Sequence, residues 1–190
     1  MEKYNKILIL VDCQYDFING SLSVTGAEAA MRNLAEFIKE HAKDYDFIFL
    51  TADWHPASHC SFKQNGGIWP LHCVQHTIGA SIYQPIIDAL YYSGVDYDVL
   101  TKGDEEDREE YSVFSNMNSG AFLTSLSKNY EIKEIDICGL ALDYCVKSTA
   151  EDAKRCFNKT NIAVLHEFSP AIGNTEETLK ELDKNGIIIM

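Results

Sequence analysis

The stretch EIDICGLALDYCVKSTAEDAKRCF, residues 134–157, joins a short apolar run to a longer polar one and decides the fold. Its first part, EIDICGL (134–140), is short and mostly apolar, and this pattern predicts a buried strand. Its second part, DYCVKSTAEDAKRCF (143–157), predicts a helix that opens with Asp143 near its N-cap. A buried strand followed directly by a helix is typical of a parallel α/β sheet.

The same alternation continues along the rest of the chain. We expect further buried strands at 6–12, 46–53, 96–102, 161–167 and 186–190. We expect further helices at 27–42, 80–90, 121–129 and 175–185, with Pro85 bending or breaking the second of them. Continuous apolar strands separated by helices predict a three-layer α/β/α fold with a mostly parallel, six-stranded sheet of Rossmann-like topology. No repeat or linker interrupts this pattern, so residues 1–190 are expected to form one domain.

Composition and charge exclude several classes of protein. The 190 residues are 46% hydrophobic and 24% charged, and the formal net charge is −13. An acidic chain has little general affinity for nucleic-acid phosphates or anionic lipid, so neither is expected as a partner. The N-terminal sequence lacks the features of a signal peptide, and no apolar run approaches the ~20 residues of a membrane helix. Together these features favour a cytoplasmic protein with reduced thiols. The six cysteines include no C-x-x-C pair, so a structural zinc knuckle is not expected.

Four chemically reactive residues lie at the expected carboxyl ends of strands. Asp12, Asp53 and Lys102 end the first three strands along the chain, and Cys145 follows the fourth. Ligands of open parallel sheets bind at this edge. The coincidence predicts a functional site there more strongly than any one of the four residues does alone.

The segment TADWHPASHCSF (51–62) contains candidate metal ligands. Asp53 and His55 are two residues apart, so in an extended segment both side chains point the same way. His72 is a third candidate. A carboxylate and two imidazoles with open positions suit zinc, iron or manganese. On spacing alone, a polar surface loop is the commoner interpretation.

His59 lies four residues after His55, a spacing that a helix would place on one face. Pro56 disfavours a helical conformation at His55, so we do not expect the two imidazoles to share that geometry.

Cys145 stands in the first turn of the expected helix. A helix N-terminus lowers a thiol pKa and offers free N–H groups that could hold an oxyanion. Asp12 and Lys102 could supply the base and the positive charge that a nucleophile needs. The alternative is a buried cysteine that packs as a small apolar side chain, and general base rates favour it.

Taken together, these segments resemble the nicotinamidase/pyrazinamidase family of the isochorismatase-like cysteine hydrolases. The matching pieces occur in the family's order and span most of the chain. They are LVDCQYDFINGSLSVTGA (10–27), TADWHPASHCSF (51–62), WPLHCVQHTIGA (69–80), KGDEEDREEYSVF (102–114) and GLALDYCVKSTAEDA (139–153).

The resemblance implies an isochorismatase-like fold and a catalytic role for three residues. Asp12 matches the general base, Lys102 the group that stabilises the thiolate and the developing charge, and Cys145 the nucleophile. The resemblance also implies a cis peptide bond at Leu140–Ala141, which would aim the N–H groups of Ala141 and Cys145 at one oxygen as an oxyanion hole.

The resemblance further implies one bound divalent metal ion, with zinc preferred and iron or manganese as alternatives. Asp53, His55 and His72 match its ligands. His59 matches a position that ligates in some members and lies outside the first shell in others, and we favour the second role.

The activity implied is hydrolysis of nicotinamide to nicotinate and ammonia in NAD salvage, with pyrazinamide as a further substrate. Phe17 and Trp69 match aromatic residues that line the pyridine pocket. The alternatives are an amidohydrolase of this fold that acts on another small amide, and a non-catalytic binding module. A homo-oligomer stays open. The acidic segment 104–110 departs from the family pattern, and we interpret it as a solvated face rather than as a modifier of substrate access.

Overall fold

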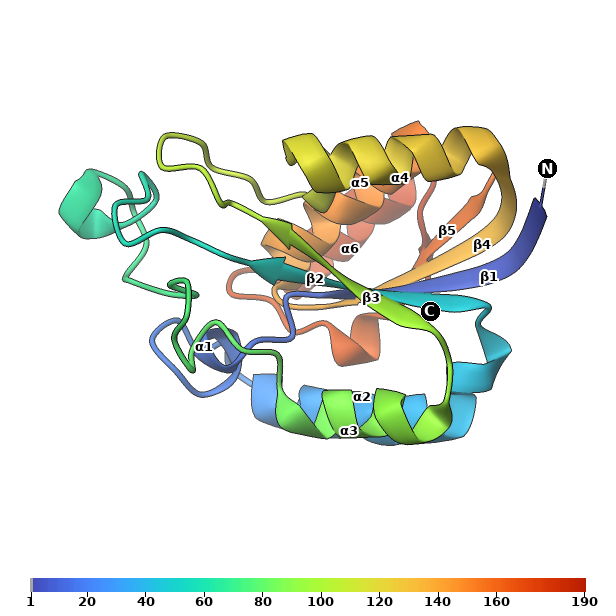
Figure 1. Cartoon of the computed structure of the whole chain (residues 1–190), viewed down its shortest axis with the longest axis horizontal. Helices are drawn as coiled ribbons and strands as arrows, with labels where there is room; N and C mark the ends of the chain where they lie inside the picture. The colour runs from blue at the N-terminus through green and yellow to red at the C-terminus, as the bar shows by residue number, and fades with distance from the viewer. Residues whose placement is uncertain (1) are drawn as a thin grey trace.

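A six-stranded sheet forms the centre of the molecule (Figure 1). The computed structural model describes residues 2–190, with side chains described from Tyr4 onward. The strands run in the order β3-β2-β1-β4-β5-β6, and every neighbouring pair is parallel. This confirms the predicted α/β fold with its Rossmann-like order. The strands are β1 (Glu2–Val11), β2 (Phe47–Asp53), β3 (Tyr97–Lys102), β4 (Tyr130–Gly139), β5 (Asn161–Val164) and β6 (Ile188–Ile189).

Helices cover both faces of the sheet, with α2 and α3 on one side and α4, α5 and α6 on the other (Figure 1). Within residues 2–190, every helix is too short or too polar to cross a membrane. The α-helices are α1 (Tyr15–Ile18), α2 (Ala27–His41), α3 (Gln84–Ser93), α4 (Met117–Asn129), α5 (Lys147–Cys156) and α6 (Thr175–Lys184). Short turns of other helix types are η1 (Ala42–Asp44), η2 (Lys63–Asn65), η3 (Val113–Ser115), η4 (Leu142–Val146) and η5 (His166–Phe168).

The central strand β1 supplies side chains to two separate cores. Leu8 and Leu10 pack with the cluster on the α2 and α3 side. Ile7, Ile9 and Val11 pack with the cluster on the opposite side. Because successive side chains of a strand point to opposite faces, a continuous apolar run is what a sheet covered on both faces requires.

Several element boundaries differ from the sequence predictions, and the differences at α3 and α4 have clear local causes. Pro85 lies in the first turn of α3, where its missing N–H costs no hydrogen bond, so it neither bends nor breaks the helix. Helix α4 begins at Met117 rather than at residue 121. The Asn116 side chain accepts hydrogen bonds from the N–H groups of Asn118 (3.0 Å) and Ser119 (3.1 Å) and so caps this earlier start.

A buried carboxylate on β4 holds neighbouring parts of the sheet together. Asp136 is only 3% exposed. It accepts a hydrogen bond of 2.8 Å from the Tyr45 hydroxyl and pairs at 2.8 Å with Lys6 Nζ on β1. Burial first, and then the Asp136 charge, raise the pKa of Tyr45, which therefore stays a donor.

We expect Tyr45→Phe to lower the free energy of unfolding by about 1–3 kcal/mol, because it leaves a buried carboxylate with one partner fewer. Urea denaturation measures this loss. Tyr92→Phe is the matched control, since it removes the same atom from a side chain that is 82% exposed. Equal stability of the two variants would contradict a stabilising role for the Tyr45 hydroxyl.

Candidate active site and metal centre

The structure brings the four strand-end residues together at the carboxyl edge of the sheet. Asp53 and Lys102 end β2 and β3 and are register partners. Asp12 follows β1, and Cys145 lies in η4 after β4. All four are buried, and none is more than 5% exposed. Lys102 is 49 residues from Asp53 and 43 residues from Cys145 in sequence, yet these side chains share one small interior space.

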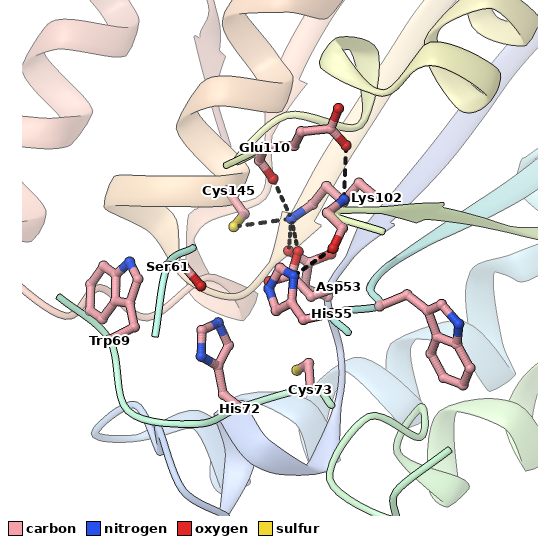
Figure 2. Close-up of polar contacts among 12 residues, drawn as sticks. Asp53, His55, Ser61, Trp69, His72, Cys73, Lys102, Glu110 and Cys145 are labelled. Atoms are coloured by element: carbon pink, nitrogen blue, oxygen red, sulfur yellow. Dashed lines mark hydrogen bonds and ion pairs between the residues drawn. The ribbon is translucent and has the colours of Figure 1, made fainter. Parts of the chain in front are cut away.

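The ammonium group of Lys102 is the centre of this cluster (Figure 2). Its Nζ lies 2.9 Å from Asp12 Oδ2 and 3.5 Å from Cys145 Sγ, and it forms an ion pair with Asp53 Oδ1. It also donates to the backbone carbonyl of Glu110 at 3.2 Å. Burial alone would lower the pKa of Lys102, but Asp12 and Asp53 raise it well above its usual value. The group is therefore a permanent cation.

Asp12 is placed to exchange a proton with the thiol. One of its carboxylate oxygens lies within 4.8 Å of Cys145 Sγ, and its Oδ1 accepts a hydrogen bond of 2.6 Å from the Thr51 hydroxyl. Its backbone has a positive φ of 47°, which is uncommon for a residue with a side chain. Burial raises the pKa of Asp12, and the opposing charge of Lys102 only partly offsets this. A carboxylate with a raised pKa is a better proton acceptor.

Cys145 lies in the π-helical turn η4 rather than in a regular α-helix. Burial raises its thiol pKa well above the usual value, and the charge of Lys102 does not overcome this. The expectation of a lowered thiol pKa is therefore wrong, because burial outweighs the positive charge of Lys102, and the charges of Asp12 and Asp53 add to the rise. The resting group is a thiol, which needs a base to become a nucleophile. The Leu140–Ala141 peptide bond just before this turn is cis, as the resemblance implies.

Asp53, His55 and His72 present three donor atoms that all lie within 4.8 Å of one another. The Nδ1–H of His55 donates to the Gly103 carbonyl at 2.8 Å, and that of His72 donates to the Pro70 carbonyl at 2.9 Å. In the neutral imidazole, each Nε2 therefore carries the lone pair. His55 Nε2 is buried without a hydrogen-bond partner, which is costly unless a ligand occupies that direction. The three residues fit a divalent ion.

The charges around these donors also suit metal binding. Burial would raise the pKa of Asp53, but Lys102 and His55 hold it below its usual range, so the carboxylate is ionised. Burial lowers the pKa of His72. The ring of His55 is also buried, yet Asp53 raises the pKa of His55, so a metal ion would have to compete there with a proton.

His59 is buried beside this group but has its nitrogens engaged elsewhere. Its Nδ1 pairs with the Ser61 hydroxyl at 2.8 Å, and its Nε2 lies 3.0 Å from the Arg108 carbonyl. Its ring stacks on that of His55, with centroids 4.0 Å apart and an angle of 26° between planes. With both ring nitrogens engaged by the protein, His59 stays a predicted neighbour of the metal ligands rather than a ligand.

An aromatic pocket opens over Cys145. Phe17 and Trp69 line it as predicted, together with Tyr111 and Tyr144, which the sequence reasoning missed. Trp69 Nε1 donates to the Tyr111 hydroxyl at 3.2 Å, and its ring meets that of Tyr144 edge-on at 5.0 Å. Both tyrosines lie inside segments that match the family, Tyr111 within 102–114 and Tyr144 directly before Cys145 within 139–153, and this placement could have identified them. The walls suit a flat, uncharged ring.

The acidic segment 104–110 divides into exposed and buried members. Its residues 105–109 are exposed, but Glu109 also lines the pocket over Cys145, so it does not belong to a purely solvated face. Glu110 contradicts that interpretation, because it is only 2% exposed. Its carboxylate leaves water because Gly103 N–H and Asn116 Nδ2 donate to it and Arg108 pairs with it.

Comparisons with known proteins agree with this geometry. The isochorismatase domain model matches residues 6–156. The nicotinamidase/pyrazinamidase of Mycobacterium tuberculosis is 34% identical, over 93% of this chain and 94% of that protein.

Two solved structures are also similar over nearly the whole chain. The pyrazinamidase of Pyrococcus horikoshii in complex with zinc has a TM-score of 0.81 and 33% identity, covering 98% of each chain. The yeast nicotinamidase bound to the inhibitor nicotinaldehyde has a TM-score of 0.84 and 28% identity, covering 97% of this chain and 99% of that one. Sequence and fold therefore agree over the same residues that build the site, and the chain belongs to the isochorismatase-domain family, among its nicotinamidase/pyrazinamidase members.

Proposed function

We propose that this chain hydrolyses the carboxamide of nicotinamide to nicotinate and ammonia, and that pyrazinamide is a second substrate. The observation that carries the proposal is the buried contact of Lys102 with both Asp12 and Cys145 beneath an aromatic pocket. The relatives named above, which include a zinc complex and an inhibitor complex, support the same chemistry. A direct assay of ammonia release from nicotinamide tests it.

The pocket would hold the substrate ring between Phe17 and Trp69, with the carboxamide facing Cys145. Asp53, His55 and His72 would hold one divalent ion, with zinc preferred and iron or manganese as alternatives. That ion would act as a Lewis acid toward the pyridine nitrogen of the substrate. Holding the ring from two sides turns the attack on the carbonyl into an oriented, unimolecular step.

In the first half of the reaction, Asp12 accepts the proton of the Cys145 thiol, and the sulfur attacks the carbonyl carbon. The backbone N–H groups of Ala141 and Cys145 would hold the oxygen as it becomes negative. Losing one such donor typically costs roughly 3–4 kcal/mol in the transition state. The C–N bond then breaks, and Asp12 returns its proton to the leaving nitrogen, which departs as ammonia.

In the second half, a water molecule attacks the thioester carbon while Asp12 accepts its proton. The C–S bond breaks, the Asp12 proton returns to the Cys145 sulfur, and the acid product gives its own proton to solvent and leaves as nicotinate. The fixed positive charge of Lys102 stabilises the Cys145 thiolate in both halves of the reaction.

The location and the metabolic role complete the proposal. Production of nicotinate would serve the salvage of pyridine nucleotides. All six cysteines are free thiols, which supports a reducing, cytoplasmic setting. They are Cys13, Cys60, Cys73, Cys138, Cys145 and Cys156.

We expect Cys145→Ala to lower the rate of ammonia release by at least about 10³-fold, because it removes the nucleophile. Nicotinamide should still bind, since the pocket walls and the metal ligands stay in place. Ammonia release and calorimetric binding measure the two effects. Cys156→Ala, a half-buried cysteine outside the pocket, is the matched control and should keep its activity. Turnover by Cys145→Ala would remove this residue from the nucleophile role.

Chelation should inactivate the protein, and added zinc should restore it. We expect His72→Asn to weaken zinc binding by more than the roughly 10–100-fold cost of losing a residue that only orients a ligand. Elemental analysis and competition with a chelating dye measure this. His166→Asn makes the same change at a histidine whose Nδ1 contacts the Met190 carbonyl, and its zinc affinity should not change. Full activity of metal-free protein would rule out the metal centre.

We expect Asp12→Asn to slow alkylation of Cys145 by iodoacetamide about 10²-fold near neutral pH, because the amide cannot accept the thiol proton. Mass spectrometry of the peptide that bears Cys145 measures the rate separately from the other cysteines. Asp98→Asn, an exposed aspartate on β3, is the control. If both variants react at the wild-type rate, Asp12 is not the activating base.

A further inference from the structure

Glu110 has a buried carboxylate at the end of a segment that is otherwise open to solvent. It is 2% exposed, whereas residues 105–109 are exposed. A charged group leaves water only where hydrogen bonds and opposite charges replace it. The partners of Glu110 therefore indicate what its burial achieves.

The two carboxylate oxygens of Glu110 have different partners. Oε2 points inward and accepts hydrogen bonds from Gly103 N–H at 2.8 Å and Asn116 Nδ2 at 2.9 Å. Oε1 pairs at 3.2 Å with Arg108 Nε, on a side chain that is 45% exposed. Only Oε2 thus contacts the backbone of the candidate site (Figure 2).

The peptide group between Lys102 and Gly103 is fixed at both ends. Its N–H donates to Glu110 Oε2, and its carbonyl accepts the N–H of Trp54 at 2.9 Å. The Glu110 backbone carbonyl also accepts Lys102 Nζ at 3.2 Å. Glu110 therefore holds the turn that follows β3 against the end of β2.

Gly103 in turn contacts His55 and fixes the orientation of its ring. The Gly103 carbonyl accepts the Nδ1–H of His55 at 2.8 Å. Gly103 has a φ of +64°, and a Cβ atom there would lie 2.4 Å from His55 Cε1. The backbone thus packs directly against the imidazole, so a shift of the turn would move the ring.

We propose that Glu110 is a positioning residue for the metal centre. Its Oε2 fixes the Gly103 peptide, the Gly103 carbonyl fixes the tautomer and orientation of His55, and His55 Nε2 is thereby aimed at the metal position. The carboxylate itself contacts neither His55 nor the substrate pocket. This inference rests on the proposed function, because it takes the metal to be the divalent ion that Asp53, His55 and His72 would hold.

Two substitutions at Glu110 separate the hydrogen bond from the charge. Glu110→Gln removes the charge but can keep an acceptor oxygen at the position of Oε2. Glu110→Asp keeps the charge but draws the acceptor back by one methylene group. If Glu110 acts through its charge, the zinc affinity of Glu110→Asp should lie closer to that of the wild type. If it acts through the Gly103 hydrogen bond, the zinc affinity of Glu110→Gln should lie closer.

The experiment is zinc titration of the metal-free full-length chain against a chelating dye, with urea denaturation to confirm that each variant is folded. We expect Glu110→Gln to bind zinc within about threefold of the wild type. We expect Glu110→Asp to bind zinc roughly 10–100-fold more weakly, the usual cost of losing a residue that orients a ligand. Wild-type affinity in Glu110→Asp, or equal loss in both variants, overturns the proposal.

Arg108→Gln is the matched control, because it removes the ion pair at Oε1 and leaves Oε2 in place. Its zinc affinity should equal that of the wild type, and a loss as large as that of Glu110→Asp would overturn the proposal. Normal zinc binding without ammonia release refutes the proposed function alone. A wild-type chain that binds no zinc overturns the role of Glu110 together with the metal centre.

Discussion

The site depends on one buried cation held among two carboxylates and a thiol. Lys102 is fully buried, so the free energy lost on removing its ammonium from water must be recovered from Asp12, Asp53 and the Glu110 carbonyl. One positive charge faces two negative ones, and a thiolate would add a third. Burial, together with this imbalance, explains why the pKa of the Cys145 thiol and the pKa of Asp12 are both raised.

Sheet topology places these groups without help from long loops. Parallel strands end at one edge, so the residues that terminate β1, β2 and β3 become neighbours wherever the register aligns them. The pairing of Asp53 with Lys102 is such an alignment. A shift of β3 by one residue would turn Lys102 toward the opposite face of the sheet. The apolar faces that fix the register therefore also fix the site.

The fold and most of the candidate site could be predicted because each depends on a local pattern. Strand ends can be located from apolar runs, and the resemblance added the ligand set and the cis peptide at Leu140–Ala141. The raised thiol pKa of Cys145 could not be predicted, because burial is a property of the whole fold. The burial of Glu110 was missed for the same reason, since a segment with five other acidic residues looks like a solvated face until Gly103 and Asn116 are placed beside Glu110.

The proposed proton acceptor and the proposed metal ligands are connected through the same short turn. Lys102 contacts Asp12 and Cys145, and Gly103, the next residue, contacts His55. The proposed nucleophile and the proposed metal position are therefore held at a fixed separation by adjacent residues of one chain segment. A substrate that is anchored at its ring and attacked at its amide needs that separation to match its own length. Under the proposed function, a rigid turn would therefore favour an amide whose length matches that separation.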